Sequence, residues 1–170
     1  MKSHKKPCWM RTIDQPCDAP SNYSVVPVEV KIAHSFNHRT WEGAYTLEFV
    51  NDHRRESKLM AARSGDEVLL TAIARVLGEL VRFGSVRISS TNEGIIQDLD
   101  GVQIWRWERA GWAKKNGDRL ENWKLYARIA AAMRGRLILF DCDRDSDIMA
   151  DASARNRSIR KYGLDQRGGK

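Results

Sequence analysis

The spacing of apolar residues in the first half of the chain changes at residue 64. Residues 25–35, 40–51 and 55–63 are rich in β-branched and aromatic side chains, and polar turn residues separate them. This pattern predicts three antiparallel strands in a meander. From residue 64 to 84 apolar residues recur every three or four positions, which predicts an amphipathic helix; they include Leu69, Ile73, Val76 and Leu80.

Two signals mark the ends of this predicted helix. Ser64 and Glu67 have the spacing of a capping box, in which the serine side chain accepts a hydrogen bond from the backbone of the third helical residue. Gly84 stands where we expect the helix to end, because glycine commonly follows a helix C-terminus.

The next segment ends in a polar run. Residues 85–90 alternate Val86 and Ile88 with polar side chains, which predicts a strand. The strand leads into Ser90-Thr91-Asn92-Glu93, and a short helix is predicted over residues 92–99. Because binding and catalytic residues concentrate in such connections, this run is our first candidate site.

The second half of the chain predicts helices around one more strand. Residues 102–122 contain a helical turn and then a charged loop, which Asn116-Gly117 interrupts. A helix over residues 122–135, ending at Gly135, precedes a buried strand over 136–143 and a last helix over 146–163. The order β-β-β-α-β-α-α-β-α predicts an α/β fold. We expect a five-stranded mixed sheet, three antiparallel strands and then two parallel ones, with helices on both faces.

We divide the chain into an arm, one domain and a tail. Residues 1–24 form an irregular N-terminal arm, since they contain three prolines and show no periodicity. Residues 25–160 form the domain, and residues 161–170 form a flexible basic tail. No segment has the pattern of a secretion signal or a membrane span, so we expect a cytoplasmic protein with no membrane partner.

The charge balance points to a polyanionic partner. The formal net charge is +7, and from residue 155 onward six basic residues face Asp165 as the single acidic one. A basic chain of this kind often binds nucleic acid. The cysteines Cys8, Cys17 and Cys142 are too few for a disulfide framework. Cys8 and Cys17 with His4 lack the spacing and the fourth ligand of a zinc site.

The order of elements and several motifs resemble the bacterial-type ribonuclease H domain, over residues 28–157. The most specific motif is IWRWERAGWAKKNGDRLENWKLYARI (residues 104–129), which resembles the basic handle of that family. Supporting matches are VEVKIAHS, GAYTLEF, ISSTNEGII and MADASARN. The resemblance implies a ribonuclease H-like fold. It also implies hydrolysis of the RNA strand of an RNA–DNA hybrid by two metal ions, which four carboxylates hold in the family.

This chain departs from the family at most of those carboxylates. The resemblance places the first three at Ala33, Val68 and Asn92, and only the last, Asp151, is retained. Mg²⁺ requires anionic oxygen ligands, so we expect most of the metal affinity to be lost and no cofactor to be bound. The family's histidine-bearing loop also lacks its histidine here, in DCDRDSD at residues 141–147.

Neighbouring acids remain as substitutes for the lost ligands. Asp66, Glu67 and Glu93 lie within two positions of them. Glu67 is also spaced to cap with Ser64, and Glu93 with Ser90, and we favour capping for both. A rebuilt metal site would use Glu67, Asp147 and Asp151, with the acidic run 141–151 as its source. The competing interpretation of that run is a solvated loop with surface ion pairs.

The handle is retained. The resemblance implies that it grips the nucleic acid, through cations on the phosphates and aromatic rings on sugars or bases. We expect Trp107 and Trp123 to anchor the handle instead, and Trp112, Lys114 and Lys115 to make contact. The predicted nucleic-acid-binding residues are Arg106, Arg109, Trp112, Lys114, Lys115, Arg119 and Asn122.

Three functions follow from these observations. The preferred one is a catalytically degenerate ribonuclease H-like protein that binds an RNA–DNA hybrid or another duplex, within a larger nucleoprotein assembly. The second is a metal-dependent endoribonuclease acting on RNA–DNA hybrids, with Mg²⁺ or Mn²⁺ in a rearranged acidic site. The third is a protein-interaction scaffold, whose partner is another polypeptide.

Overall fold

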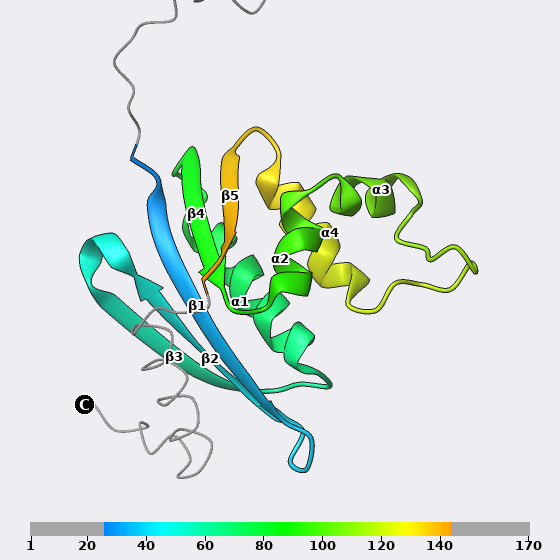
Figure 1. Ribbon diagram of the computed structural model, residues 1–170, viewed down its shortest axis with the longest axis horizontal. Helices are drawn as coiled ribbons and strands as arrows, with labels where there is room; N and C mark the ends of the chain where they lie inside the picture. The colour runs from blue at the N-terminus through cyan, green and yellow to red at the C-terminus, as the bar shows by residue number, and fades with distance from the viewer. Residues whose placement is uncertain (1–25, 144–170) are drawn as a thin grey trace, which may run out of the picture.

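A computed structural model describes residues 26–143 of the 170-residue chain (Figure 1). Within them, five strands form one sheet in the order β3-β2-β1-β4-β5. The elements in chain order are β1 (Val28–Asn37), β2 (Glu42–Phe49), the short helix η2 (Val50–Asp52), β3 (Arg54–Ala61), α1 (Gly65–Glu79), β4 (Ser85–Ser90), α2 (Glu93–Asp100), α3 (Gln103–Arg109), α4 (Trp123–Met133) and β5 (Leu137–Cys142).

The pairing of the strands confirms the predicted mixed sheet. β1, β2 and β3 are antiparallel neighbours, whereas β4 lies parallel to both β1 and β5. Parallel strands end at the same edge of a sheet, so the polar run after β4 lies at the carboxyl edge that β1 and β5 share. The predicted and observed ends of the strands differ by no more than three residues.

One face of the sheet carries the hydrophobic core. α1 packs on β1 and β2, on the side away from the viewer in Figure 1, and α4 packs beside α1. Burial on this face confirms the predicted apolar side of α1, since Leu69, Ile73, Val76 and Leu80 are all buried. The last predicted helix, residues 146–163, lies outside the described residues, as do the arm and the tail.

The two ends of α1 differ in how well the sequence predicts them. Ser64 accepts a hydrogen bond from the backbone N–H of Glu67, as the capping box requires. The predicted end at Gly84 is wrong, because α1 ends five residues earlier, at Glu79. The guanidinium of Arg136 donates to the carbonyls of Leu77 and Leu80 there, so the helix end needs no glycine.

The end of α4 follows the prediction. Gly135 has φ +70°, the left-handed conformation in which glycine ends helices, two residues after α4 stops. Among residues 26–143, none of the helices has the length and apolar content that a bilayer span requires.

Candidate functional site

Asn92 connects the starts of two helices at the carboxyl edge of the sheet. It is the N-cap of α2, and its side-chain oxygen accepts a hydrogen bond of 3.1 Å from the backbone N–H of Ile95. Its side-chain nitrogen donates to the carboxylate of Asp66, 3.1 Å away in the first turn of α1. Asn92 therefore has a structural role, and both ends of its amide are occupied.

The N-cap of α2 also corrects one prediction. Because Asn92 caps the helix, the expected pairing of Glu93 with Ser90 is wrong. Glu93 instead accepts a hydrogen bond from the side chain of Gln97, one turn further along α2.

Two other positions of the implied metal site are buried and apolar. Ala33 is 2% exposed in β1. Val68 is fully buried and faces Gly43 of β2, where an added Cβ would lie only 2.1 Å from the Val68 side chain. A carboxylate at residue 68 would point into this packed contact. Asp151, the one retained family carboxylate, lies outside the described residues.

The described residues do not fit a pair of divalent cations. Within residues 26–143, no three His, Cys, Asp or Glu side chains are grouped closely enough to hold a metal ion. Glu67 is one of the three ligands of the rebuilt metal site considered above. It accepts a 2.7 Å hydrogen bond from the backbone N–H of Arg63 and stabilises the start of α1. The other two ligands of that site, Asp147 and Asp151, lie outside the described residues.

Burial governs the protonation of the groups around this junction. It lowers the pKa of His34, and the nearby carboxylate of Asp66 offsets part of that effect. Burial raises the pKa of Asp98. The Tyr126 hydroxyl donates a hydrogen bond of 3.5 Å to Asp98 and offsets part of that rise in pKa. Burial, with Asp98 beside it, also raises the pKa of Tyr126, which stays protonated. The hydrogen bond between Asp98 and Tyr126 joins α2 to α4, whereas Nδ1 of the buried His34 has no hydrogen-bond partner among residues 26–143.

The handle projects from the sheet as α3 and the loop that follows it (Figure 1). Its predicted contact cations are all exposed, and none forms an ion pair with a carboxylate among residues 26–143. Two acids of this segment have other partners, since Glu108 pairs with Arg134 and Asp118 accepts from the Asn116 side chain. The exposed cations are Arg106, Arg109, Lys114, Lys115 and Arg119.

The handle tryptophans act mainly as anchors. Trp107 packs edge-on against Tyr126, with ring centroids 5.1 Å apart, as expected for an anchor. Trp123 is partly buried against the core, and the guanidinium of Arg119 lies 4.6 Å from its ring. Trp112 corrects our prediction of contact, because it is only 9% exposed and belongs to the core.

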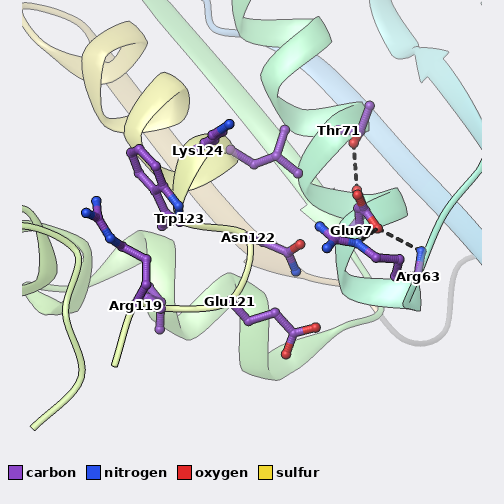
Figure 2. Close-up of a pocket in the computed structure, with 10 residues that line it drawn as sticks. Arg63, Glu67, Thr71, Arg119, Glu121, Asn122, Trp123 and Lys124 are labelled. Carbon is purple, nitrogen blue, oxygen red and sulfur yellow. Dashed lines mark hydrogen bonds and ion pairs between the residues drawn. The ribbon is translucent and has the colours of Figure 1, made fainter. Parts of the chain in front are cut away.

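A groove runs between the handle and α1 (Figure 2). Its volume is about 570 Å³, and it is lined on one side by Arg63, Glu67 and Thr71 of the α1 start. The other side is residues 119–125, which include the predicted contact residue Asn122. Asn122 has φ +56°, and its backbone carbonyl accepts from the first turn of α4. The sequence brought Arg119 and Asn122 to attention, but not Arg63, which precedes α1 and has no motif.

The comparisons with known proteins identify the fold. Neither a protein-family model nor a curated protein matches the sequence. A foamy viral protease-reverse transcriptase solved with an RNA/DNA hybrid matches over 91% of this chain at 9% identity, with a TM-score of 0.61. This chain spans 22% of that protein's length.

Two ribonuclease H structures match more of their own length. The first is the PFV RNase H domain, with 8% identity and a TM-score of 0.58 over 78% of this chain and 90% of that one. The second is LC9-RNase H1, described as a type 1 RNase H with the type 2 active-site motif, with 15% identity and a TM-score of 0.56 over 78% of this chain and 72% of that one. Together with the strand order and the helix positions, these matches show that the chain has a ribonuclease H-like fold.

Proposed function

We propose that this protein is a catalytically degenerate ribonuclease H-like protein that binds nucleic acid through its handle. The expected ligand is an RNA–DNA hybrid or another duplex, and the expected setting is a larger nucleoprotein assembly in the cytoplasm. The foamy viral protein with a similar fold was solved with an RNA/DNA hybrid and also with double-stranded DNA, which supports a duplex ligand.

One observation carries this proposal: the five exposed handle cations have no acidic partners among residues 26–143, and within the same residues no three His, Cys, Asp or Glu side chains gather closely enough to hold a metal ion. Unpaired cations are available to neutralise phosphates and release counterions. At the edge, Ala33 and Val68 are buried, and Asn92 is a neutral helix cap. The chain therefore combines a phosphate-binding surface with a poor metal site.

The test is binding of labelled duplexes across a salt series. We expect RNA–DNA hybrid, double-stranded RNA and double-stranded DNA to bind at low salt, each more weakly as salt rises. A protein that binds none of the three at about 50 mM salt would overturn the proposal, because electrostatic contacts are strongest there.

The second candidate function is an enzyme, because the sequence retains one family carboxylate, Asp151. In that case the protein is an endoribonuclease on RNA–DNA hybrids, and Mg²⁺ or Mn²⁺ is its cofactor. A cleavage assay with each ion, repeated on Asp151→Asn, separates the two functions. We expect no cleavage by either protein; cleavage that requires the ion and disappears with Asp151→Asn would establish the enzyme.

The scaffold alternative is favoured by apolar side chains at the opposite edge of the sheet. Val26, Val81, Phe83 and Leu137 are each 49–71% exposed near the amino ends of β1, β4 and β5. Exposed apolar groups that gather in this way often mark protein interfaces. A polypeptide that co-purifies in equal amount without nucleic acid, and that is released by Phe83→Ser, would support this function.

A further inference from the structure

Trp41 stands out at the tip of the β1–β2 hairpin. Its side chain is 58% exposed, and its backbone has φ +55°, a left-handed conformation that is costly for a bulky residue. Two backbone hydrogen bonds hold it: the N–H donates to Asn37 at 2.9 Å, and the carbonyl accepts from Ala62 at 3.0 Å. The hairpin thus holds a large aromatic ring in the solvent at a conformational cost.

The core does not account for this ring. Its only described aromatic neighbour is Phe36, edge-on with ring centroids 6.2 Å apart. An indole that is mostly exposed loses most of the burial free energy that normally justifies a tryptophan. Exposed aromatic side chains are surfaces on which nucleic-acid bases stack.

Trp41 also lies at the end of a groove. A hollow of about 310 Å³ is lined by Trp41, Ala61, Ala62, Arg63 and Glu67. Two of these residues, Arg63 and Glu67, also line the larger groove beside the handle. The two hollows therefore adjoin at the start of α1, one on the side of the handle and the other on the side of the hairpin.

The groove beside the handle carries a small net positive charge, because Arg63, Arg119 and Lys124 line it together with the two acids Glu67 and Glu121. Glu67 is paired with Arg63, through the Arg63 backbone N–H and its guanidinium. Arg119 and Lys124 therefore remain with Glu121 as the other charges of the groove. Cations near an exposed aromatic ring match a single nucleic-acid strand, with phosphates on the cations and a base on the ring.

We propose that Trp41 stacks on an unpaired base of a strand that leaves the handle-bound duplex and follows this groove. The proposal deepens the proposed function and rests on it. It names the ligand class as a duplex with a single-stranded extension. It also makes Trp41 a binding residue outside the handle, one that a blunt duplex does not reach.

The experiment compares a blunt RNA–DNA hybrid with the same hybrid carrying a five-nucleotide extension, 5′ in one version and 3′ in another. We expect one extension to lower the Kd about tenfold, the scale of one base stacked on an aromatic ring. Trp41→Asn should abolish this gain and leave blunt binding unchanged, since asparagine tolerates the left-handed backbone. Trp41→Phe should keep part of the gain.

The outcomes separate this inference from the proposed function. If no hybrid binds, blunt or extended, the proposed function fails. If the blunt hybrid binds but neither extension tightens it, or if Trp41→Asn keeps the whole gain, the stacking site is wrong and the duplex function stands. A thermal melt of Trp41→Asn is the folding control, and tryptophan emission quenched by the extension in the native protein but not in Trp41→Phe is an independent readout.

Discussion

Asn92 uses both ends of its side-chain amide to connect α1 with α2. Asn92→Ala should lower the free energy of unfolding by about 1 kcal/mol, the usual cost of a lost N-cap. Asn92→Asp restores the carboxylate that the resemblance implies, but places it against Asp66. We expect that variant to lose about 1 kcal/mol at neutral pH through repulsion, although aspartate is an equally good cap.

Urea denaturation measures both changes, and an exchange of the two residues is the control. With Asp66→Asn combined with Asn92→Asp, an amide again faces a carboxylate, so most of the lost stability should return. Stabilisation of Asn92→Asp by millimolar Mg²⁺ would contradict our account of this edge, because it would mean that a single carboxylate restores the ion site.

His34 makes stability depend on pH. Burial lowers its pKa in the folded protein below the ordinary value of about 6.5, so the unfolded chain binds the proton more readily. Its contribution to stability is therefore present above about pH 6.5 and is lost as the pH falls toward the folded pKa. His34→Gln should flatten the decline in melting temperature between about pH 7.5 and 5. An equal decline in the native protein and His34→Gln would contradict this.

At the scale of elements, Arg136 ties the ends of α1 and α4 together. Its guanidinium donates to Leu77, Leu80 and Phe83 at the end of α1, at 2.6–3.1 Å, and to Ala132 in the last turn of α4. Hydrogen bonds from a charged donor to partly buried carbonyls contribute more than surface ion pairs.

Arg136→Ala should lower the free energy of unfolding by about 2–3 kcal/mol, because those carbonyls lose their donor. Arg136→Lys should recover less than half, since an ammonium lacks the planar fork. Arg134→Ala is the matched control: its ion pair with Glu108 is largely exposed, so we expect a loss of at most about 1 kcal/mol. Denaturant midpoints measure all three, and equal losses at residues 134 and 136 would refute the role of Arg136.

The sequence predicted most helices and strands because the features that start and end them lie within a few residues of each other along the chain. The capping box at Ser64, the alternation in residues 85–90 and the stop at Gly135 each act within a few residues. The end of α1 was predicted wrongly for the opposite reason. Its last carbonyls bond to Arg136, which lies more than fifty residues away, and no local pattern carries such information.

At the scale of the whole molecule, the sequence predicted the strand order and the mixed sheet better than it predicted the surface. Trp112 belongs to a basic, aromatic motif, yet left-handed backbone at Gly111 and Trp112 turns the chain so that the indole is buried. Arg63 and Trp41 were missed because they have no motif. They came to notice only because the fold places the hairpin, the start of α1 and the handle around two adjoining hollows that share Arg63 and Glu67.

The position of the cations, and not the net charge alone, should determine how strongly duplex binding depends on salt. Each phosphate contact lowers the slope of log K against log salt by about 0.9 on B-form DNA, so removing Lys114 and Lys115 together should make the slope less steep by about 1.8. A control that removes the exposed cations Lys58 and Arg82, which lie outside the handle, changes the net charge equally. We expect the control to leave the slope nearly unchanged, as long-range attraction is screened beyond about 10 Å at 0.1 M salt. If both double variants reduce the slope alike, net charge and not the handle drives binding.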